Sequence, residues 1–227
     1  MRKLFIHIPK NGGHSIRKQF RKKFDHAIHH LDEQHVREFK TQMKKYGEHD
    51  VPGHARWRDL INVGDAPCFA IVRNPWDRTV ARYTFMLKAI ERERKYSDNY
   101  TKKSFEEFLE ERHEWGNLDF FWYRVIHNWF PQKDYVTDLE GKSRCDVLRF
   151  EHYQQDASDY LNVGQVNYHN VSNGDIVEGR SKIVKRKDYR EFYNAETIQI
   201  VADWYKDDIE FFGFDFDTTA TRNIWAT

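Results

Sequence analysis

The sequence has little cysteine, little proline and no long apolar run. It holds 2 cysteines and 5 prolines in 227 residues, and two thiols in or beside apolar stretches do not make the disulfide framework of a small secreted domain. No segment approaches the roughly 18 continuous apolar residues of a membrane span, and the first residues lack the apolar core of a signal peptide. We therefore expect a cytoplasmic protein in a reducing compartment, with no membrane partner.

The chain also lacks an excess of charge of one sign. Lys and Arg number 37 against 36 Asp and Glu, so the formal net charge is +1. A protein that binds nucleic acid through its overall field has a strongly basic domain, and we therefore expect no nucleic-acid partner. Aromatic residues make up 16% of the chain, and most of these large side chains should pack in a core while some line a pocket.

Apolar runs and helical patterns alternate along the chain. Short apolar runs bounded by turn residues predict buried strands at residues 3–8, 67–75 and 145–153. Helical patterns begin near residue 15 and cover 77–95, parts of 104–130 and 194–212, with Gly213 ending the last helix. Residues 25–50 indicate helix and surface loop, and 162–188 a flexible loop. This order predicts one α/β domain over residues 1–227, with a central, mostly parallel sheet, helices on both faces, and a ligand at the carboxyl ends of its strands.

The loop after the first strand has the composition of an anion-binding site. In HIPKNGGHS, residues 7–15, Lys10 precedes Gly12 and Gly13, and Ser15 stands at the helix start. Glycines let backbone N–H groups approach an anion, the helix N-terminus adds partial positive charge, and the lysine adds a full charge. Because the lysine precedes the glycines, this is not the GxxxxGK[ST] loop of ATPases and kinases. Taken alone, two glycines more often shape an ordinary turn.

This loop closely resembles the HIPKTGGTS loop that surrounds the 5′-phosphosulfate of 3′-phosphoadenosine 5′-phosphosulfate (PAPS) in the Golgi glycan O-sulfotransferases and their bacterial relatives. Asn11 and His14 stand where those enzymes have threonines. The resemblance implies a P-loop-like three-layer fold and transfer of a sulfuryl group from PAPS to an acceptor hydroxyl, with PAP as the product and Lys10 holding the leaving phosphate. It implies these donor-binding residues in the loop: Lys10, Asn11, Gly12, Gly13, His14 and Ser15.

A second segment, AIVRNPWDRTVARY at residues 70–83, resembles the 3′-phosphate element of the same family, an R-x-P-x-x-R-x-x-S pattern at the end of a buried strand. Arg73, Pro75 and Arg78 match the pattern, while Ala81 replaces the serine. A guanidinium makes bidentate bonds to a phosphate that lysine does not match in geometry. An arginine after a strand is more often a surface ion-pair partner, but together with the first loop it indicates a PAPS site.

The resemblance continues weakly at residues 147–156, 166–175 and 187–214, and so covers nearly the whole chain. Between the last two of these segments lies a basic one, GRSKIVKRK at residues 179–187. Related enzymes close a late basic loop over the nucleotide, so the resemblance makes Arg180 and Lys182 candidates for contacts to the donor. A solvated, charged loop explains the same composition equally well.

A catalytic base is needed because an acceptor hydroxyl has a pKa far above neutral, and general base catalysis contributes roughly 10²–10⁴-fold. The segment GHARWRDL, residues 53–60, resembles the one in glycan 6-O-sulfotransferases where a histidine before a tryptophan is the proposed base. His54 is the matching residue, and His14 is the second candidate. The alternative for His54 is a structural histidine that caps a helix or bonds a backbone carbonyl.

Other histidines and one carboxylate leave alternatives open. His26 with His30, or His29 with Asp32, would share a face if that segment were helical and so suggest a metal site, although a solvated helix explains them better. Sulfuryl transfer from PAPS requires no metal, and we expect none. A kinase or phosphatase would need a carboxylate for Mg²⁺ after a strand, for which only Glu151 is placed. A nucleotide sensor would keep both anion loops without a base.

The acceptor is left open by the sequence. The resemblance implies a hydroxyl on a glycan, and a small molecule is equally compatible. Four tryptophans would suit stacking on a sugar, although each also suits a core: Trp57, Trp115, Trp122 and Trp129. The sequence makes no prediction of oligomeric state.

Overall fold

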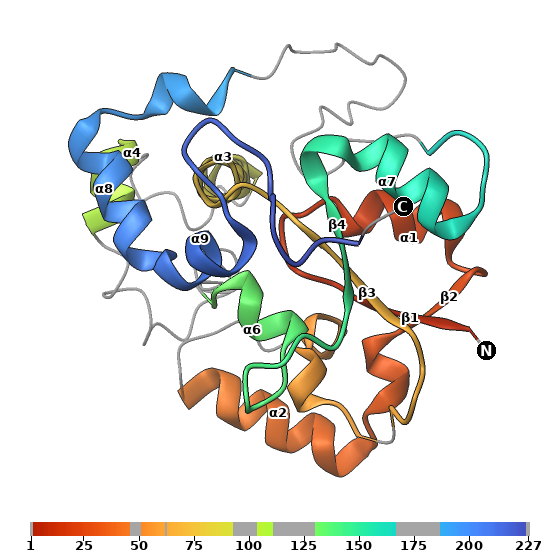
Figure 1. The fold of residues 1–227 in the computed structure, drawn as a ribbon. Coiled ribbons are helices and arrows are strands. Elements are labelled where there is room, and N and C mark those ends of the chain that lie inside the picture. Colours follow the sequence, from red (N-terminus) through yellow and green to blue (C-terminus); the bar gives the residue numbers. More distant parts are fainter. Residues whose placement is uncertain are drawn as a thin grey trace.

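The computed structural model describes residues 2–45, 51–61, 63–92, 104–110, 130–166 and 187–225. Within these ranges, one four-stranded sheet has the order β2-β1-β3-β4 and all of its neighbouring strands are parallel (Figure 1). The strands are β1 (Lys3–Ile6), β2 (Phe24–His26), β3 (Cys68–Val72) and β4 (Asp146–Arg149). The helices are α1 (Gly13–Phe20), α2 (Glu33–Lys45), α3 (Pro75–Arg92), α4 (Phe105–Glu110), α6 (Gln132–Val136), α7 (Tyr153–Leu161), α8 (Ala195–Trp204) and α9 (Lys206–Phe212).

The strands bury both of their faces. Because side chains alternate along a strand, Leu4 and Ile6 of β1 join one buried cluster while Phe5 joins the other. Figure 1 shows α1 and α7 together on one side of the sheet and α3, α6, α8 and α9 on the other. The three-layer α/β fold predicted from the alternation of strands and helices is therefore confirmed.

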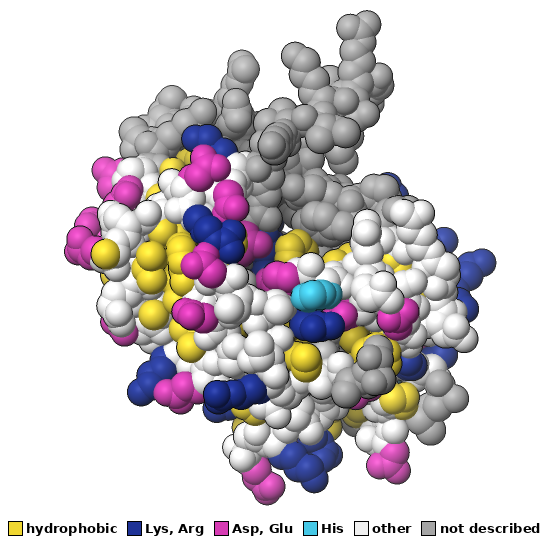
Figure 2. Space-filling model, turned by 45° about the horizontal axis from the view of Figure 1, so that its top comes forward, with side chains coloured by type: hydrophobic (Ala, Val, Ile, Leu, Met, Phe, Trp, Pro, Cys, Tyr) yellow, Lys and Arg dark blue, Asp and Glu magenta, His cyan; other side chains and the backbone are white. Residues whose placement is uncertain are grey.

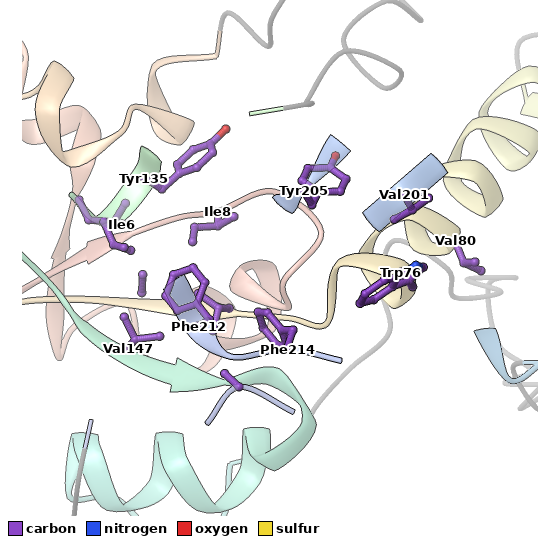
Figure 3. Packing of buried hydrophobic residues seen from close by; sticks show 14 of the residues in the cluster. Ile6, Ile8, Trp76, Val80, Tyr135, Val147, Val201, Tyr205, Phe212 and Phe214 are labelled. Carbon is purple, nitrogen blue, oxygen red and sulfur yellow. The ribbon is translucent and has the colours of Figure 1, made fainter. Parts of the chain in front are cut away.

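The larger cluster joins the sheet to the C-terminal helices. Figure 3 shows Phe212 among Ile6, Ile8 and Val147, with Phe214, Trp76 and Tyr205 farther along the same core. Tyr205 and Phe212 are completely shielded from solvent, and fully burying one such aromatic side chain contributes about 1.5–3 kcal/mol. The C-terminal helices thus hold the carboxyl half of the sheet in place.

Two elements differ from the sequence predictions. The helix expected over residues 194–212 is two helices, because Tyr205 leaves the helical region with φ −112° and ψ 26°. Gly213 does end the second of them in a left-handed conformation with φ 67°, as predicted. Residues 24–26 form β2, which was missed because three residues in a basic, His-rich run show no alternation.

The strand order fixes where a ligand fits. From β1 the chain crosses to β2 on one side, and it later returns to β3 on the other side of β1, so the order reverses between β1 and β3. In open parallel sheets the crevice outside the carboxyl ends of the strands at such a switch point is the usual ligand site. The loop of residues 7–12 and the turn at Arg73 lie at these two adjacent ends.

The surface agrees with the balanced composition. Figure 2 shows acidic and basic side chains interspersed over the face in view, in keeping with the formal net charge of +1. None of the helices in the described part of the chain combines the length and apolar character that crossing a bilayer requires.

Candidate active site

The loop between β1 and α1 turns sharply at two left-handed residues. Lys10 has φ 71° and Gly12 has φ 78°, and a lysine in this region is uncommon because its Cβ crowds the backbone. Helix α1 then begins at Gly13, where the backbone N–H of Ser15 donates to Gly12 O at 3.0 Å. The result is a tight loop that leads into a helix N-terminus, as the anion-site interpretation predicted.

Both glycines are required by close packing. A Cβ at Gly13 would lie 2.1 Å from Cδ2 of His7, and one at Gly12 would lie 2.8 Å from Cε2 of Tyr153. The Tyr153 hydroxyl also donates to Gly12 O at 3.0 Å. The glycines thus let β1 and α7 approach the loop and hold its shape, which goes beyond the ordinary turn considered above.

The two arginines of the second motif donate hydrogen bonds to backbone carbonyls of this loop. Arg73 is 1% exposed and donates from Nη1 to Lys10 O at 2.8 Å, while Arg78 is 0% exposed and donates from Nε to Pro9 O at 3.3 Å. Asp77 accepts from Arg73 Nε at 2.8 Å and neutralises that buried charge. The sequence predicted that both motifs form one site, and the structure brings them into direct contact.

The turn between Arg73 and α3 is fixed by Asn74. Its side-chain Oδ1 caps the helix by accepting from Trp76 N at 3.0 Å, and its backbone N–H donates to Glu151 Oε1 at 2.7 Å. Asn before Pro75 is the usual sequence of an N-cap followed by N1. Burial raises the pKa of Glu151, and its other oxygen accepts from Thr219 at 3.2 Å. Glu151 is exposed as a residue, but both of its carboxylate oxygens already accept hydrogen bonds from the protein.

The side chain of Asn11 faces the protein interior. Its Nδ2 donates to Ile71 O at 2.7 Å and to Gln132 Oε1 at 2.6 Å, and the residue is 1% exposed. Contact of Asn11 with the donor stays a prediction, and the backbone is the part of this residue that remains for it. The predicted cation in the same loop, Lys10, is half-buried, with Nζ 4.0 Å from the ring centroid of Phe85.

The other predicted donor residues divide into two groups. His14 is exposed and Ser15 is buried in the first turn of α1, so both lie at the loop as expected. Arg180 and Lys182 lie outside the described residues, and their contact with the donor stays a prediction.

His54 lies against the same loop. It belongs to the short 3-10 turn Pro52–His54, its Nδ1 is 2.8 Å from His7 O, and the two imidazole centroids are 4.2 Å apart. A carbonyl oxygen only accepts, so Nδ1 carries the proton and the lone pair lies on Nε2. Burial lowers the pKa of His54 to about 4, against the opposing effect of the bond to His7. The carbonyl bond is the one that a structural histidine would make, and it is also the bond that orients a base.

Two further histidines lie buried beside His54. Burial lowers the pKa of His7 well below its ordinary value and that of His26 to about 3, so both are neutral at pH 7. His26 ends β2, and therefore the suggestion that it shares a helix face with His30 was wrong. In the described ranges, no three His, Cys, Asp or Glu side chains are arranged to hold a metal ion.

Three residues at the site were missed by the sequence reasoning. His7 is the first residue of the loop motif, but the sequence reasoning gave it no role at the site. Gln132 follows Pro131 with no motif around it, and it became visible only through its contacts. Asp208 could have been noticed in the sequence. It lies three residues after Tyr205 and four before Phe212, on the face of the C-terminal helices that is buried, and a carboxylate at a buried position indicates specific hydrogen-bond partners.

The opposite edge of the sheet holds a pocket of about 570 Å³ at the starts of β3 and β4. Trp57 lines it, with the Arg144 guanidinium 4.6 Å from its ring centroid, as do the free thiols Cys68 and Cys145. Trp57 therefore lies away from the anion loops, and its place does not support stacking on an acceptor. The other three candidate tryptophans, Trp115, Trp122 and Trp129, lie outside the described residues.

The fold and the site together define an α/β protein with a P-loop-like anion site, built from a glycine loop at a helix N-terminus and two buried arginines. A model of the Sulfotransferase family matches residues 3–215 of this chain. No curated protein and no solved structure matches it. Because the family match covers nearly the whole sequence, the chain belongs to the Sulfotransferase family.

Membership in this family makes the protein an enzyme that transfers a sulfuryl group from PAPS to a hydroxyl acceptor. The residues present fit the donor, which carries anionic groups at both ends of its nucleoside. The left-handed loop before α1 and the Lys10 cation suit one anion. Arg73, in the adjacent turn, and Arg78, on α3, place two positive charges beside that loop, but both are buried and bond its carbonyls, so their contact with the second anion stays a prediction. The family match also decides against a kinase or a nucleotide sensor.

Proposed function

We propose that this enzyme sulfates a hydroxyl on a glycan or a small molecule, with His54 as the general base and Lys10 at the leaving phosphate. The observation that carries the proposal is the hydrogen bond between His54 Nδ1 and His7 O. It places an imidazole of defined tautomer against the loop that the family uses for the sulfuryl donor.

The donor supplies a sulfuryl group on a phosphate leaving group, and the protein positions both ends of it. Backbone N–H groups of residues 10–14, at the α1 N-terminus, bind the 5′ end, where Lys10 balances the charge that grows on the leaving phosphate. Arg73 and Arg78 bind the 3′-phosphate while they also hold the loop carbonyls. Arg180 and Lys182 complete the donor site in this proposal.

His54 takes the proton of the acceptor hydroxyl at Nε2. The hydroxyl oxygen forms its bond to sulfur as the bond from sulfur to the 5′-phosphate oxygen breaks, and that electron pair leaves with PAP. The imidazolium that forms is stabilised by its Nδ1–H bond to the His7 carbonyl, the role that an orienting carbonyl or carboxylate has beside other catalytic histidines. Alignment of the donor, acceptor and base then contributes through proximity.

We also propose that residues 1–227 form one domain that acts in the cytoplasm. The family match over residues 3–215 supports one domain, as does the parallel sheet that joins all four strands of the described residues. The two free thiols agree with a reducing compartment.

A thermal-shift screen followed by a transfer assay tests the proposal. PAP and PAPS should raise the unfolding temperature in the absence of Mg²⁺, because a ligand that binds only the native state stabilises it, whereas ATP and GTP should not. Labelled PAPS with panels of glycans and small hydroxyl compounds should then yield a sulfated product. Binding of ATP with Mg²⁺ in preference to PAP, or binding of PAP without transfer to any hydroxyl including water, would overturn it.

A further inference from the structure

Gln132, the first residue of α6, is completely buried and uses its whole amide group within the protein. Its Oε1 accepts from Asn11 Nδ2 at 2.6 Å and from the backbone N–H of Arg73 at 2.9 Å. Its Nε2 donates to Arg73 O at 2.7 Å and to Asp208 Oδ2 at 3.3 Å. An amide has two donor hydrogens and two acceptor lone pairs, so all of its hydrogen-bonding capacity is used.

These bonds connect the two anion-binding segments to each other. Asn11 belongs to the loop after β1. Gln132 accepts from the backbone N–H of Arg73, which follows β3, and donates to the backbone carbonyl of the same residue. Arg73 also contacts the loop directly, because its Nη1 donates to Lys10 O at 2.8 Å. One amide therefore sets the position of the loop relative to the arginine, and it does so in a dry interior where an unmade hydrogen bond is expensive.

Asp208 fixes the far side of this amide. Its Oδ1 accepts from the backbone N–H of Lys133 at 2.8 Å, and it is completely buried on α9. The carboxylate thereby holds the Gln132 side chain in one orientation, with Nε2 toward Asp208 and Oε1 toward Asn11. The hydrogen-bond network around the Gln132 amide thus joins four separate segments of the chain, represented by Asn11, Arg73, Gln132 and Asp208.

We propose that Gln132 is a positioning residue that sets the spacing between the two anion subsites, so that one nucleotide with anions at its 3′ and 5′ ends engages both at once. The inference rests on the proposed function, since it takes the loop for the 5′ end and Arg73 for the 3′ end. Gln132 acts through Asn11 and Arg73 and contacts neither anion itself.

The proposal separates ligands that use both subsites from ligands that use one. Linking two groups in one molecule gains affinity only when both sites are held at the matching distance. A shortened side chain at Gln132 should therefore weaken PAP, which has both phosphates. It should leave adenosine 3′-monophosphate and adenosine 5′-monophosphate nearly unchanged, because each needs only one subsite. A merely structural role would weaken all three ligands alike.

The experiment is calorimetric titration of these three nucleotides into the wild-type protein, Gln132→Asn and the control Gln155→Asn. Gln155 suits the control because it is exposed on α7, where its Nε2 donates to Asp159 Oδ2 of the same helix at 2.6 Å. We expect Gln132→Asn to weaken PAP about tenfold or more while both monophosphates change by less than about threefold. The control should match the wild type.

A second variant keeps the test decisive if Gln132→Asn fails to fold. Asn11→Ala removes the Nδ2 group that donates to Gln132 Oε1 and should show the same selective loss of PAP affinity. Equal weakening of all three nucleotides, or unchanged PAP binding in a folded variant, would overturn the role of Gln132. Failure of the wild-type protein to bind PAP would instead overturn the proposed function, so the two failures are distinguishable.

Discussion

His54 and His7 are joined by a hydrogen bond of 2.8 Å between an imidazole Nδ1 and a backbone carbonyl oxygen. The carbonyl belongs to the residue that leads from β1 into the glycine loop, so His54 is hydrogen-bonded to the main chain at the start of that loop. A backbone partner orients the ring without adding a titrating group.

The first prediction concerns the pH dependence of the reaction. Burial lowers the pKa of His54 to about 4, so its Nε2 stays unprotonated well below the ordinary histidine value near 6.5. We expect kcat/KM, which reports the free enzyme, to hold from pH 7 to about pH 5 and to fall as pH drops through about 4. The profile should be recorded with one acceptor over this range. A fall centred near pH 6.5 would show that the base is a solvated histidine.

The second prediction concerns Lys10. Lys10→Ala should lower kcat much more than PAP affinity, because charge on the leaving phosphate is larger in the transition state than in the bound ground state. The matched control is Lys18→Ala, because Lys18 is an exposed lysine on α1, the helix that follows the loop. Near-wild-type turnover in Lys10→Ala would show that the loop has another role.

Much of the site could be predicted because its signals are local. Glycines after a strand and an R-x-P-x-x-R pattern are short motifs, and the parallel sheet brought them together at one edge as expected. Gln132 had no such signal, since its importance comes from partners on three other segments. The inward turn of Asn11 was equally hidden, because a polar residue in a glycine loop reads as ligand-facing.

The sequence predicted a strand or helix correctly where the hydrophobic periodicity and the length of the segment indicated the same type of element. β3 is an apolar run that is buried at every residue, and β4, the last strand of the described sheet, carries the two buried apolar residues Val147 and Leu148. The three-residue β2 and the break at Tyr205 were not predicted, because tertiary contacts rather than local preference decide them. The hydroxyl of Tyr205 accepts from the buried Arg82 at 3.0 Å.

The third prediction concerns the stability contributed by Asp208. Burial raises its pKa to about 6, above the unfolded value near 3.9. A group with a raised folded pKa contributes stability that is present below the unfolded pKa and is lost as pH rises through the folded pKa. Asp208→Asn cannot ionise, although its amide N–H₂ replaces one of the two oxygens that accept from Gln132 Nε2 and Lys133 N–H. From pH 4 to pH 7 the free energy of unfolding of the variant should therefore rise relative to that of the wild type, by roughly 3 kcal/mol at most.

Urea unfolding of both proteins at several pH values measures this difference. The histidines act in the opposite direction, since the lowered pKa values of His54 and His26 contribute stability that is lost as pH falls from about 6.5 toward 4 and 3. Comparing the two proteins at each pH cancels that common effect. A difference that does not vary from pH 4 to pH 7 would contradict the buried, titrating carboxyl.

The fourth prediction concerns the missing family serine. Ala81 is 1% exposed on α3, one turn after Arg78. A hydroxyl there has a local partner, as Thr79 shows by donating to Pro75 O at 2.8 Å, so Ala81→Ser should fold. We expect modestly tighter PAP binding by calorimetry, with one charge-assisted hydrogen bond adding about 1.5–3 kcal/mol at most. Weaker binding in the folded variant would show that α3 meets the donor differently from the family pattern.

The catalytic role of His54 is the central claim, and His54→Ala tests it most directly when transfer and donor binding are measured on the same protein. Because a base acts on the acceptor proton and not on the nucleotide, kcat with labelled PAPS should fall by roughly 10²-fold or more. The dissociation constant of PAP by calorimetry should stay within about threefold of wild type. A variant that retains full turnover would contradict the account and move the role of base to His14, the exposed histidine at the start of α1.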